Sequence, residues 1–218
     1  MISASIAAVI FVVSFLLGSI PNGVIVGKVF YHTDIRTVGS GNIGTTNAIR
    51  ALGKKGGYAV FLLDFAKGVL SGAIALAIMG ATASVEGALT CADGLCLAFL
   101  GAGLGHIFSP WLGFKGGKGI AVCVGAMFVT FGPLAALIEL ALFVVVVAAT
   151  KYVSAGSIAA AVLCPFMALW VFWGDWTAVV VCAIMAAVVI WAHRANIGRL
   201  LHGTESKFQW HKNAPGQS

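Results

Sequence analysis

The segment from Asp34 to Arg50 carries the residue types that bind a phosphate group. Three glycines, Gly39, Gly41 and Gly44, are interleaved with hydroxyl and amide side chains. Glycine tolerates positive φ, which turns successive backbone N–H groups toward one anion, and the polar side chains add neutral donors. We predict an anion-binding loop; a flexible turn with a helix cap is the alternative. The polar candidates are Ser40, Asn42, Thr45, Thr46 and Asn47.

A short helix is predicted to begin near Thr45 or Thr46 and to end at Gly53. The N-terminus of such a helix directs its free N–H groups and its dipole toward a bound phosphate. Arg50 follows one turn after Thr46, where its guanidinium can make a forked contact with phosphate oxygens. We therefore include Arg50 among the candidates for binding an anion.

A second glycine-rich connection, Gly105 to Gly119, contains Lys115 and Lys118. It differs from a nucleotide-binding P-loop, because Leu112 and Gly119 occupy the positions of that loop's first glycine and its Ser or Thr. The usual hydroxyl ligand of Mg²⁺ is therefore missing, which disfavours nucleotide hydrolysis. We predict that the two lysines close on a phosphate ester. The alternative is a pair of lysines that only mark membrane topology.

Further candidates lie in the tail and in two apolar runs. A helix after residue 192 would place His193 and Asn196 on one face, within reach of one ligand. The alternative for this tail is an interfacial stop sequence whose arginines extend toward lipid headgroups. Ser157 is a polar residue at a span entrance. Asp64 and Lys67 share a helix face, so they form an internal ion pair or Lys67 contacts substrate.

The composition indicates that a membrane protein carries these residues. Hydrophobic residues make up 60% and charged residues 9% of the 218 positions, which leaves too little polar surface for a soluble globule. A helix needs about 20 apolar residues to cross a bilayer. We predict one all-α integral membrane domain over residues 1–218 with seven transmembrane helices, with a turn at Gly132-Pro133 between the fourth and fifth. The predicted spans are residues 5–29, 57–81, 89–105, 119–132, 134–150, 157–173 and 177–192.

Basic residues gather on one side of this arrangement. The positive-inside rule makes that side cytoplasmic and predicts an N-out, C-in topology with cytoplasmic active-site loops. One long helix through Gly132 would instead place Lys151 on the opposite side. Acidic Glu86, Asp93 and Asp175 lie at or near the other side. The 13 basic residues are Lys28, Arg36, Arg50, Lys54, Lys55, Lys67, Lys115, Lys118, Lys151, Arg194, Arg199, Lys207 and Lys212.

Several other classes of protein are disfavoured by the sequence. The first span lacks a basic leading segment and a cleavage pattern, so we interpret it as a retained helix rather than a signal peptide. The five cysteines have neither C-x-x-C spacing nor a matching histidine cluster, which favours packing over a disulfide scaffold or a zinc site. Topology accounts for most of the net charge of +6, so we expect no nucleic-acid partner.

Taken in order, the motifs resemble the bacterial membrane glycerol-3-phosphate acyltransferases that use acyl phosphate as donor, the PlsY family. The resemblance covers nearly the whole chain. It rests on Gly18-Ser-Ile-Pro21, on Asp34-Ile-Arg with the block Gly39 to Arg50, on Leu63-Asp-Phe-Ala-Lys-Gly68, on Gly105-His106 with Phe114 to Gly119, and on His193 to Leu200.

The resemblance implies an enzyme that transfers an acyl group from acyl phosphate to glycerol-3-phosphate, giving lysophosphatidic acid and phosphate, the first acylation step of phospholipid synthesis. It also implies a multi-pass protein of the bacterial cytoplasmic (inner) membrane in contact with membrane lipids. We expect no cofactor, no metal and no obligate protein partner. It implies that Ser40, Asn42, Thr46 and Asn47 shape a phosphate-binding hole, and that Arg50, Lys118, Ser157, His193 and Asn196 contact the substrate phosphates.

The sequence does not identify a general base for this reaction. Soluble-domain glycerol acyltransferases share an H-x4-D pair, which none of the five histidines here forms. We therefore hypothesise that the donor phosphate accepts the hydroxyl proton, with His193 positioning the substrates. Two other classes of protein are disfavoured. A transporter for a phosphate compound would need an anion path on both sides of the membrane, and a scaffold leaves the three connections unexplained.

Overall fold

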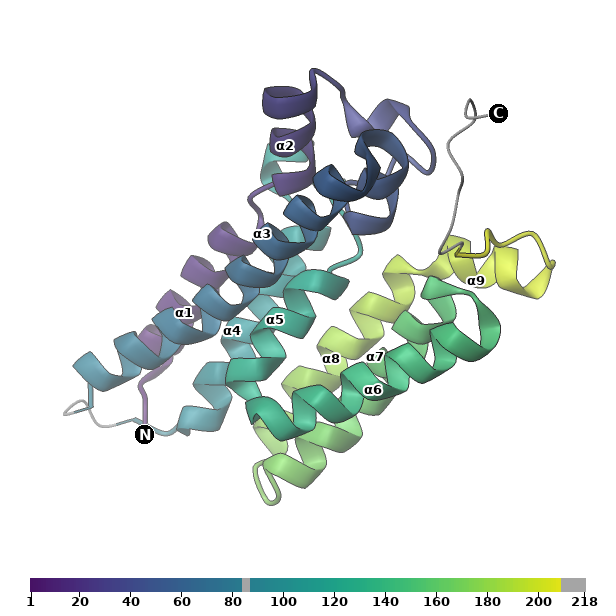
Figure 1. Ribbon diagram of the computed structural model, residues 1–218. Coiled ribbons are helices and arrows are strands. Elements are labelled where there is room, and N and C mark those ends of the chain that lie inside the picture. The colour runs from purple at the N-terminus through teal and green to yellow at the C-terminus, as the bar shows by residue number, and fades with distance from the viewer. Residues whose placement is uncertain (84–86, 209–218) are drawn as a thin grey trace, which may run out of the picture.

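The computed structural model describes residues 1–83 and 87–208, and there the chain is helical (Figure 1). The only strand-like pairing in these residues is an isolated bridge between Ile2 and Leu89. Two residues named above, Glu86 and Lys212, lie outside the described ranges. The elements are α1 (Ala4–Gly18), α2 (Asn22–Tyr31), η1 (Ile35–Thr37), α3 (Thr45–Ala81), α4 (Cys91–Ile107), η2 (Pro110–Leu112), α5 (Ile120–Thr130), α6 (Gly132–Thr150), α7 (Val153–Val171), α8 (Trp176–Ala192) and α9 (Arg194–Leu201).

Five helical segments in the described ranges are long and apolar enough to cross a membrane, and α8 with α9 makes a sixth if that pair, bent by 56°, is one span. The helix α5, at the predicted span 119–132, is apolar but only 11 residues long. The all-α prediction is therefore confirmed for the described residues, whereas seven spans remain a prediction. The five segments are Ala4–Tyr31, Thr45–Ala81, Cys91–Leu112, Gly132–Thr150 and Val153–Val171.

The predicted span 5–29 is broken into α1 and α2 by the segment Ser19-Ile-Pro21. Proline has no N–H group to donate, so it interrupts the helical hydrogen bonds at this point. Two distant side chains bind carbonyl groups at the break: the Ser109 hydroxyl donates to the Ser19 carbonyl at 2.7 Å, and the Lys67 ammonium donates to the Ile20 carbonyl at 2.7 Å. The break thus ties α1 to α3 and to the connection after α4.

Two glycines at helix boundaries have the backbone that the sequence predicts. Gly53 interrupts α3 with φ +77°, so a short helix from Thr45 precedes the long membrane segment. Gly132 has φ +81° at the junction of α5 and α6, which confirms a turn rather than one continuous helix. Positive φ is costly for residues with a Cβ atom, which explains glycine at both positions.

Small residues bring α1 and α4 into close contact. A Cβ atom at Gly101 or Gly105 of α4 would overlap the carbonyl oxygen of Phe11 or Phe15 on α1. Such small-residue faces are typical of helix pairs in membranes, where close backbone approach supplies packing energy. The pair α1 and α4 is therefore closely packed.

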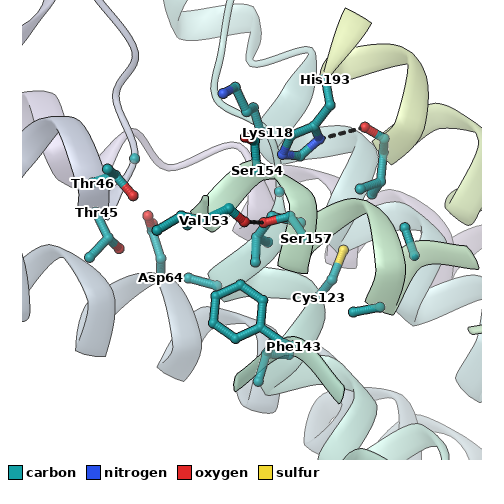
Figure 2. A pocket seen from close by; sticks show the side chains of 18 of the residues that line it. Thr45, Thr46, Asp64, Lys118, Cys123, Phe143, Val153, Ser154, Ser157 and His193 are labelled. Atoms are coloured by element: carbon teal, nitrogen blue, oxygen red, sulfur yellow. Dashed lines mark hydrogen bonds between the residues drawn. The ribbon is translucent and has the colours of Figure 1, made fainter. Parts of the chain in front are cut away.

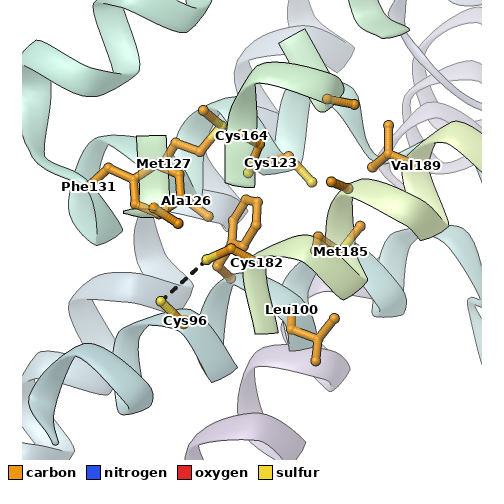
Figure 3. Close-up of a cluster of buried hydrophobic side chains, with 14 of the residues drawn as sticks. Cys96, Leu100, Cys123, Ala126, Met127, Phe131, Cys164, Cys182, Met185 and Val189 are labelled. Atoms are coloured by element: carbon orange, nitrogen blue, oxygen red, sulfur yellow. Dashed lines mark hydrogen bonds between the residues drawn. The ribbon is translucent and has the colours of Figure 1, made fainter. Parts of the chain in front are cut away.

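The main hydrophobic core joins α4, α5, α6, α7 and α8 (Figure 3). The Sγ atoms of Cys96 and Cys182 lie 3.4 Å apart and link α4 with α8. Four of the five free cysteines are buried in this core, which confirms packing for them, whereas Cys91 is exposed. Several core residues, Phe99, Met127 and Met185 among them, also line the cavity described below, so packing of the core influences the cavity shape.

The connections gather at two ends of the helices (Figure 1). One end holds α2, α9 and the glycine-rich connections, and the N-terminus lies at the other. At the N-terminal end, Thr90 donates a hydrogen bond of 2.5 Å to Asp175, which joins the start of α4 to the start of α8. The candidate anion-binding residues are thus on the end that carries the basic connections.

Candidate active site

A cavity of about 850 Å³ is lined by residues of α3 to α9, by the connections before α3 and α5, and by the segment after α9. Polar side chains line one part of it, and Figure 2 shows several of them from these elements facing the same space. The rest of the wall is apolar, with Phe99, Met127, Phe128, Phe143 and Met185 among its residues. One cavity therefore combines a polar region with space for a hydrocarbon chain.

Asn47 holds the loop before α3 in shape. Its Oδ1 accepts a hydrogen bond from the Ser40 amide at 2.9 Å, and its Nδ2 donates to the Ile35 carbonyl at 2.8 Å. Gly39 and Gly41 have φ of +59° and +67°, as the anion-loop prediction requires, whereas Gly44 has ordinary negative φ. Asn47 is buried and both ends of its amide are occupied, so it acts on a ligand mainly by positioning the loop.

The N-terminus of α3 opens onto the cavity. Gly44 caps the helix without a side-chain hydrogen bond, and Gly44, Thr45 and Thr46 line the wall. The hydroxyl of Thr45 is buried with no hydrogen-bond partner among the described residues. Free helix N–H groups beside an unpartnered hydroxyl and the Arg50 side chain, which also lines the cavity, suit a phosphate group.

Lys118 is joined to the tail by a chain of hydrogen bonds. Its ammonium donates to Asn196 Oδ1 at 2.5 Å, and Asn196 Nδ2 donates to Glu205 Oε1 at 2.7 Å. Ser154 and Arg199 also donate to Glu205, at 2.8 and 2.7 Å. Burial favours a higher pKa for Glu205, but the hydrogen bonds from Asn196, Ser154 and Arg199 outweigh it and lower that pKa. Glu205 is therefore ionised, and it holds Asn196, Ser154 and Arg199 in place beside the cavity.

Burial lowers the pKa of Lys118 to about 8, although the nearby Glu205 carboxylate acts in the opposite direction. Loss of water around an ammonium disfavours its charged form, and the positive charges of Arg199 and Arg50 add to this effect. An anion that enters the cavity beside Lys118 would favour the charged form of its ammonium.

The loop that carries Lys118 contacts a buried polar cluster. The amide of Gly117 donates to the His106 carbonyl at 3.0 Å, and a Cβ atom at Gly117 would overlap the His106 ring. His106 Nδ1 lies 3.0 Å from the Lys67 ammonium, which forms the predicted ion pair with Asp64 at 3.0 Å. Asn22 donates to the same Asp64 oxygen at 3.0 Å. This cluster links α2, α3 and α4 to the position of Lys118.

His193 and Ser157 lie at the polar part of the cavity (Figure 2). His193 is 2% exposed, and its Nδ1 lies 2.8 Å from the Val189 carbonyl oxygen. A carbonyl only accepts hydrogen bonds, so Nδ1 must carry the proton and Nε2 is the nitrogen left for a ligand. The Ser157 hydroxyl donates to the Val153 carbonyl at 2.9 Å, which leaves its oxygen able to accept.

The structure brings most of the predicted site residues to one cavity. Gly41 lies outside the wall and shapes the loop, Lys115 is exposed on its connection, and Lys67 is held in the buried cluster. A substrate contact by these three stays a prediction. The predicted residues that line the cavity are Ser40, Asn42, Gly44, Thr46, Asn47, Arg50, Lys118, Ser157, His193 and Asn196.

Other residues of the wall were not assigned to the site from the sequence, among them Ser154, Arg199, Glu205 and Glu139. Ser154 lies three residues before Ser157 on the same helix, so spacing signalled it. Arg199 and Glu205 reach the cavity because the tail turns back, which no local pattern reports. Glu139 is an isolated acid in an apolar run, which is itself a signal of function in a membrane protein. Among the described residues, no three His, Cys, Asp or Glu side chains converge to hold a metal ion.

The family model of glycerol-3-phosphate acyltransferase matches residues 8–203. A relative named glycerol-3-phosphate acyltransferase from Clostridioides difficile (strain 630) is 43% identical over 92% of this chain and 94% of its own. The relative of that name from Rhodopseudomonas palustris (strain BisB5) is 41% identical over 95% and 98%.

Two solved structures are similar over most of the chain. The crystal structure of PlsY, an integral membrane glycerol 3-phosphate acyltransferase, in its glycerol 3-phosphate form has a TM-score of 0.80 at 36% identity and covers 93% of this chain and 96% of that one. The lysophosphatidic acid form gives 0.78 at 35% identity, over 93% and 95%. The chain therefore belongs to the PlsY family of membrane glycerol-3-phosphate acyltransferases.

Proposed function

We propose that this protein transfers the acyl group of an acyl phosphate to a hydroxyl of glycerol-3-phosphate. The hydroxyl oxygen forms an ester bond to the acyl carbon, the bond from that carbon to the phosphate oxygen breaks, and the products are lysophosphatidic acid and phosphate. The observation that carries the proposal is the single cavity, whose polar region suits two phosphates and whose apolar region suits an acyl chain. The relatives' names and the two ligand forms of PlsY support it.

The cationic groups offset the repulsion between the two anionic substrates, which is the main physical difficulty of this reaction. Two anionic substrates repel each other in a partly dehydrated pocket, where charge interactions are much stronger than in water. Arg50 and Lys118 supply positive charge, and Thr46 with the start of α3 supplies neutral donors. Holding the hydroxyl beside the acyl carbon removes a further part of the barrier.

We propose that the donor phosphate, rather than a side chain, accepts the hydroxyl proton. His193 donates through Nδ1 to a backbone carbonyl and not to a carboxylate, so the structure gives it no acidic partner of the kind that orients a catalytic base. Its Nε2 is assigned to positioning a substrate. Rescue of a His193→Ala variant by imidazole, after loss of all turnover with binding retained, would instead support a base.

The polar end of the cavity is proposed to face the cytoplasm, with seven spans, N-out and C-in, in the inner membrane. For this count the short α5 and the bent pair of α8 and α9 each cross as one span. The support is the basic charge of the connections at that end. Labelling of single cysteines placed at Lys118 and Asn47 tests the orientation, and reaction with an impermeant reagent from outside would contradict it.

The activity is tested with purified protein in detergent, given acyl phosphate and glycerol-3-phosphate. Formation of lysophosphatidic acid with an equal amount of phosphate is the expected result. Acyl-CoA offered in place of acyl phosphate distinguishes the donor, because only acyl phosphate is expected to react. Absence of product, together with movement of a phosphate compound across vesicles that contain the protein, would overturn the proposal in favour of transport.

The rate is expected to fall as the pH rises through about 8. Lys118 is charged below its pKa of about 8 and neutral above it, so its attraction for phosphate is lost on the alkaline side. The profile of kcat/KM reports the free enzyme and is the quantity to measure. In Lys118→Arg the guanidinium stays charged, so the residual activity should decline only at higher pH. If kcat/KM falls at the same alkaline pH in the wild-type protein and in Lys118→Arg, the decline is not due to Lys118.

A further inference from the structure

Glu139 is a buried acid in the cavity wall that the proposed chemistry does not use. It lies within α6 and is 3% exposed. Its Oε1 atom is buried without a hydrogen-bond partner, and it forms no ion pair with any described residue. An unpaired acid inside a membrane protein is costly and is found where it faces a ligand or a cavity. Glu139 lines the cavity, which gives it access to a ligand.

The neighbourhood of Glu139 belongs to the apolar part of the cavity. Ala136, Leu140 and Phe143 of the same helix also line the wall. The helix ends at Thr150, next to the connection that leads to Ser154 and the polar network. Glu139 lies eleven residues before that end, which is about 16 Å along the helix axis at 1.5 Å per residue. A chain that extends along α6 from the polar region thus meets this carboxyl group far from its own reacting end.

We propose that Glu139 determines which acyl chains the cavity accepts, by accepting a hydrogen bond from a hydroxyl group on the distal half of the chain. This inference rests on the proposed function, because it concerns the donor's acyl group. An unsubstituted chain leaves Oε1 without a partner. A hydroxyl at that depth supplies the missing donor and finds an acceptor for itself, whereas in a wholly apolar pocket its burial would be costly.

The donor series that tests this uses three acyl phosphates of equal length. One is unsubstituted, one carries a hydroxyl near the carbonyl, and one carries it on the distal half. We expect kcat/KM for the distal hydroxyl donor to exceed that of the unsubstituted donor by about tenfold, the factor that corresponds to about 1.4 kcal/mol. The donor with the proximal hydroxyl should show no such preference, because its hydroxyl does not reach Glu139.

Variants of Glu139 distinguish recognition of the distal hydroxyl group from a general change in the cavity wall. Glu139→Leu removes the acceptor, so the preference for the distal hydroxyl should disappear while the unsubstituted donor still reacts. Glu139→Gln keeps a carbonyl oxygen as acceptor and should keep most of the preference. Phe143→Leu is the matched control, since it alters the same wall without a polar group and should change the rates of both donors alike.

The outcomes separate this inference from the proposed function. If the wild-type protein makes lysophosphatidic acid from all three donors without preferring the distal hydroxyl, the inference is wrong and the function stands. The inference is equally wrong if Glu139→Leu keeps the preference. No product from any acyl phosphate would overturn the proposed function and this inference together. Because the wild-type comparison needs no substitution, poor folding of a variant does not leave the question open.

Discussion

Replacing Lys118 with alanine is expected to lower kcat/KM by about a hundredfold to a thousandfold, the usual loss when one donor to a developing negative charge is removed. Lys118 lines the cavity and is partly buried, so water cannot fully replace its charge. It also contacts Asn196, so the variant loses both a cation and the orientation of that amide. The measurement is initial rate of lysophosphatidic acid formation at several concentrations of each substrate.

Lys115→Ala is the matched control for this prediction. Lys115 lies on the same connection and has the same charge, but it is exposed and outside the cavity wall. Its removal tests the predicted substrate contact of Lys115: a change in kcat/KM of no more than twofold, roughly the effect of an exposed charge, would count against that contact, and a larger loss would support it. If both variants lose activity equally, general positive charge on this connection matters and the specific position of Lys118 does not.

Replacing Lys67 with methionine is expected to lower the free energy of unfolding by about 3 to 5 kcal/mol, the usual cost of breaking a buried ion pair by removing one partner. Lys67 is 4% and Asp64 1% exposed, and the ammonium also satisfies the Ile20 carbonyl at the break between α1 and α2. The variant leaves both acceptors with fewer donors. Unfolding by denaturant in detergent, followed by a spectroscopic signal, measures the change.

Lys28→Met is the control variant for the buried ion pair between Lys67 and Asp64. Lys28 lies 3.7 Å from Asp34, but its side chain is 57% exposed, so we expect a change within about 1 kcal/mol. A second variant, Lys67→Met with Asp64→Leu, removes both charges and should recover part of the loss. Equal stability of Lys67→Met and the wild-type protein would show that the ion pair and its carbonyl contact contribute nothing.

The sequence was most informative where function depends on local spacing. The positive φ of Gly39 and Gly41, the helix from Thr45, the non-helical Gly53 and the turn at Gly132 are all set by residues close together in the chain. Positive φ at glycine and free N–H groups at a helix start are local consequences of residue type. These features could therefore be predicted without knowing the tertiary structure.

Other parts of the site depend on contacts between distant residues, which local patterns do not report. Glu205 binds Ser154, 51 residues away, only because the tail turns back over the cavity. The break at Pro21 is compatible with a continuous apolar run and is stabilised by Ser109, which is not near it in the sequence. Residue spacing left two alternatives for Lys67, and the structure shows the ion pair with Asp64, buried beside His106.

The returning tail has a practical consequence for handling this protein. Glu205, Ser206 and Phe208 form part of the cavity wall, and the Phe208 amide donates to the Lys151 carbonyl at 2.7 Å. A chain cut after α9, at residue 202, would lose this wall and expose the cavity to water. Purification tags and fusion partners at the carboxyl end therefore belong beyond Phe208, separated by a spacer that leaves this segment free to fold back.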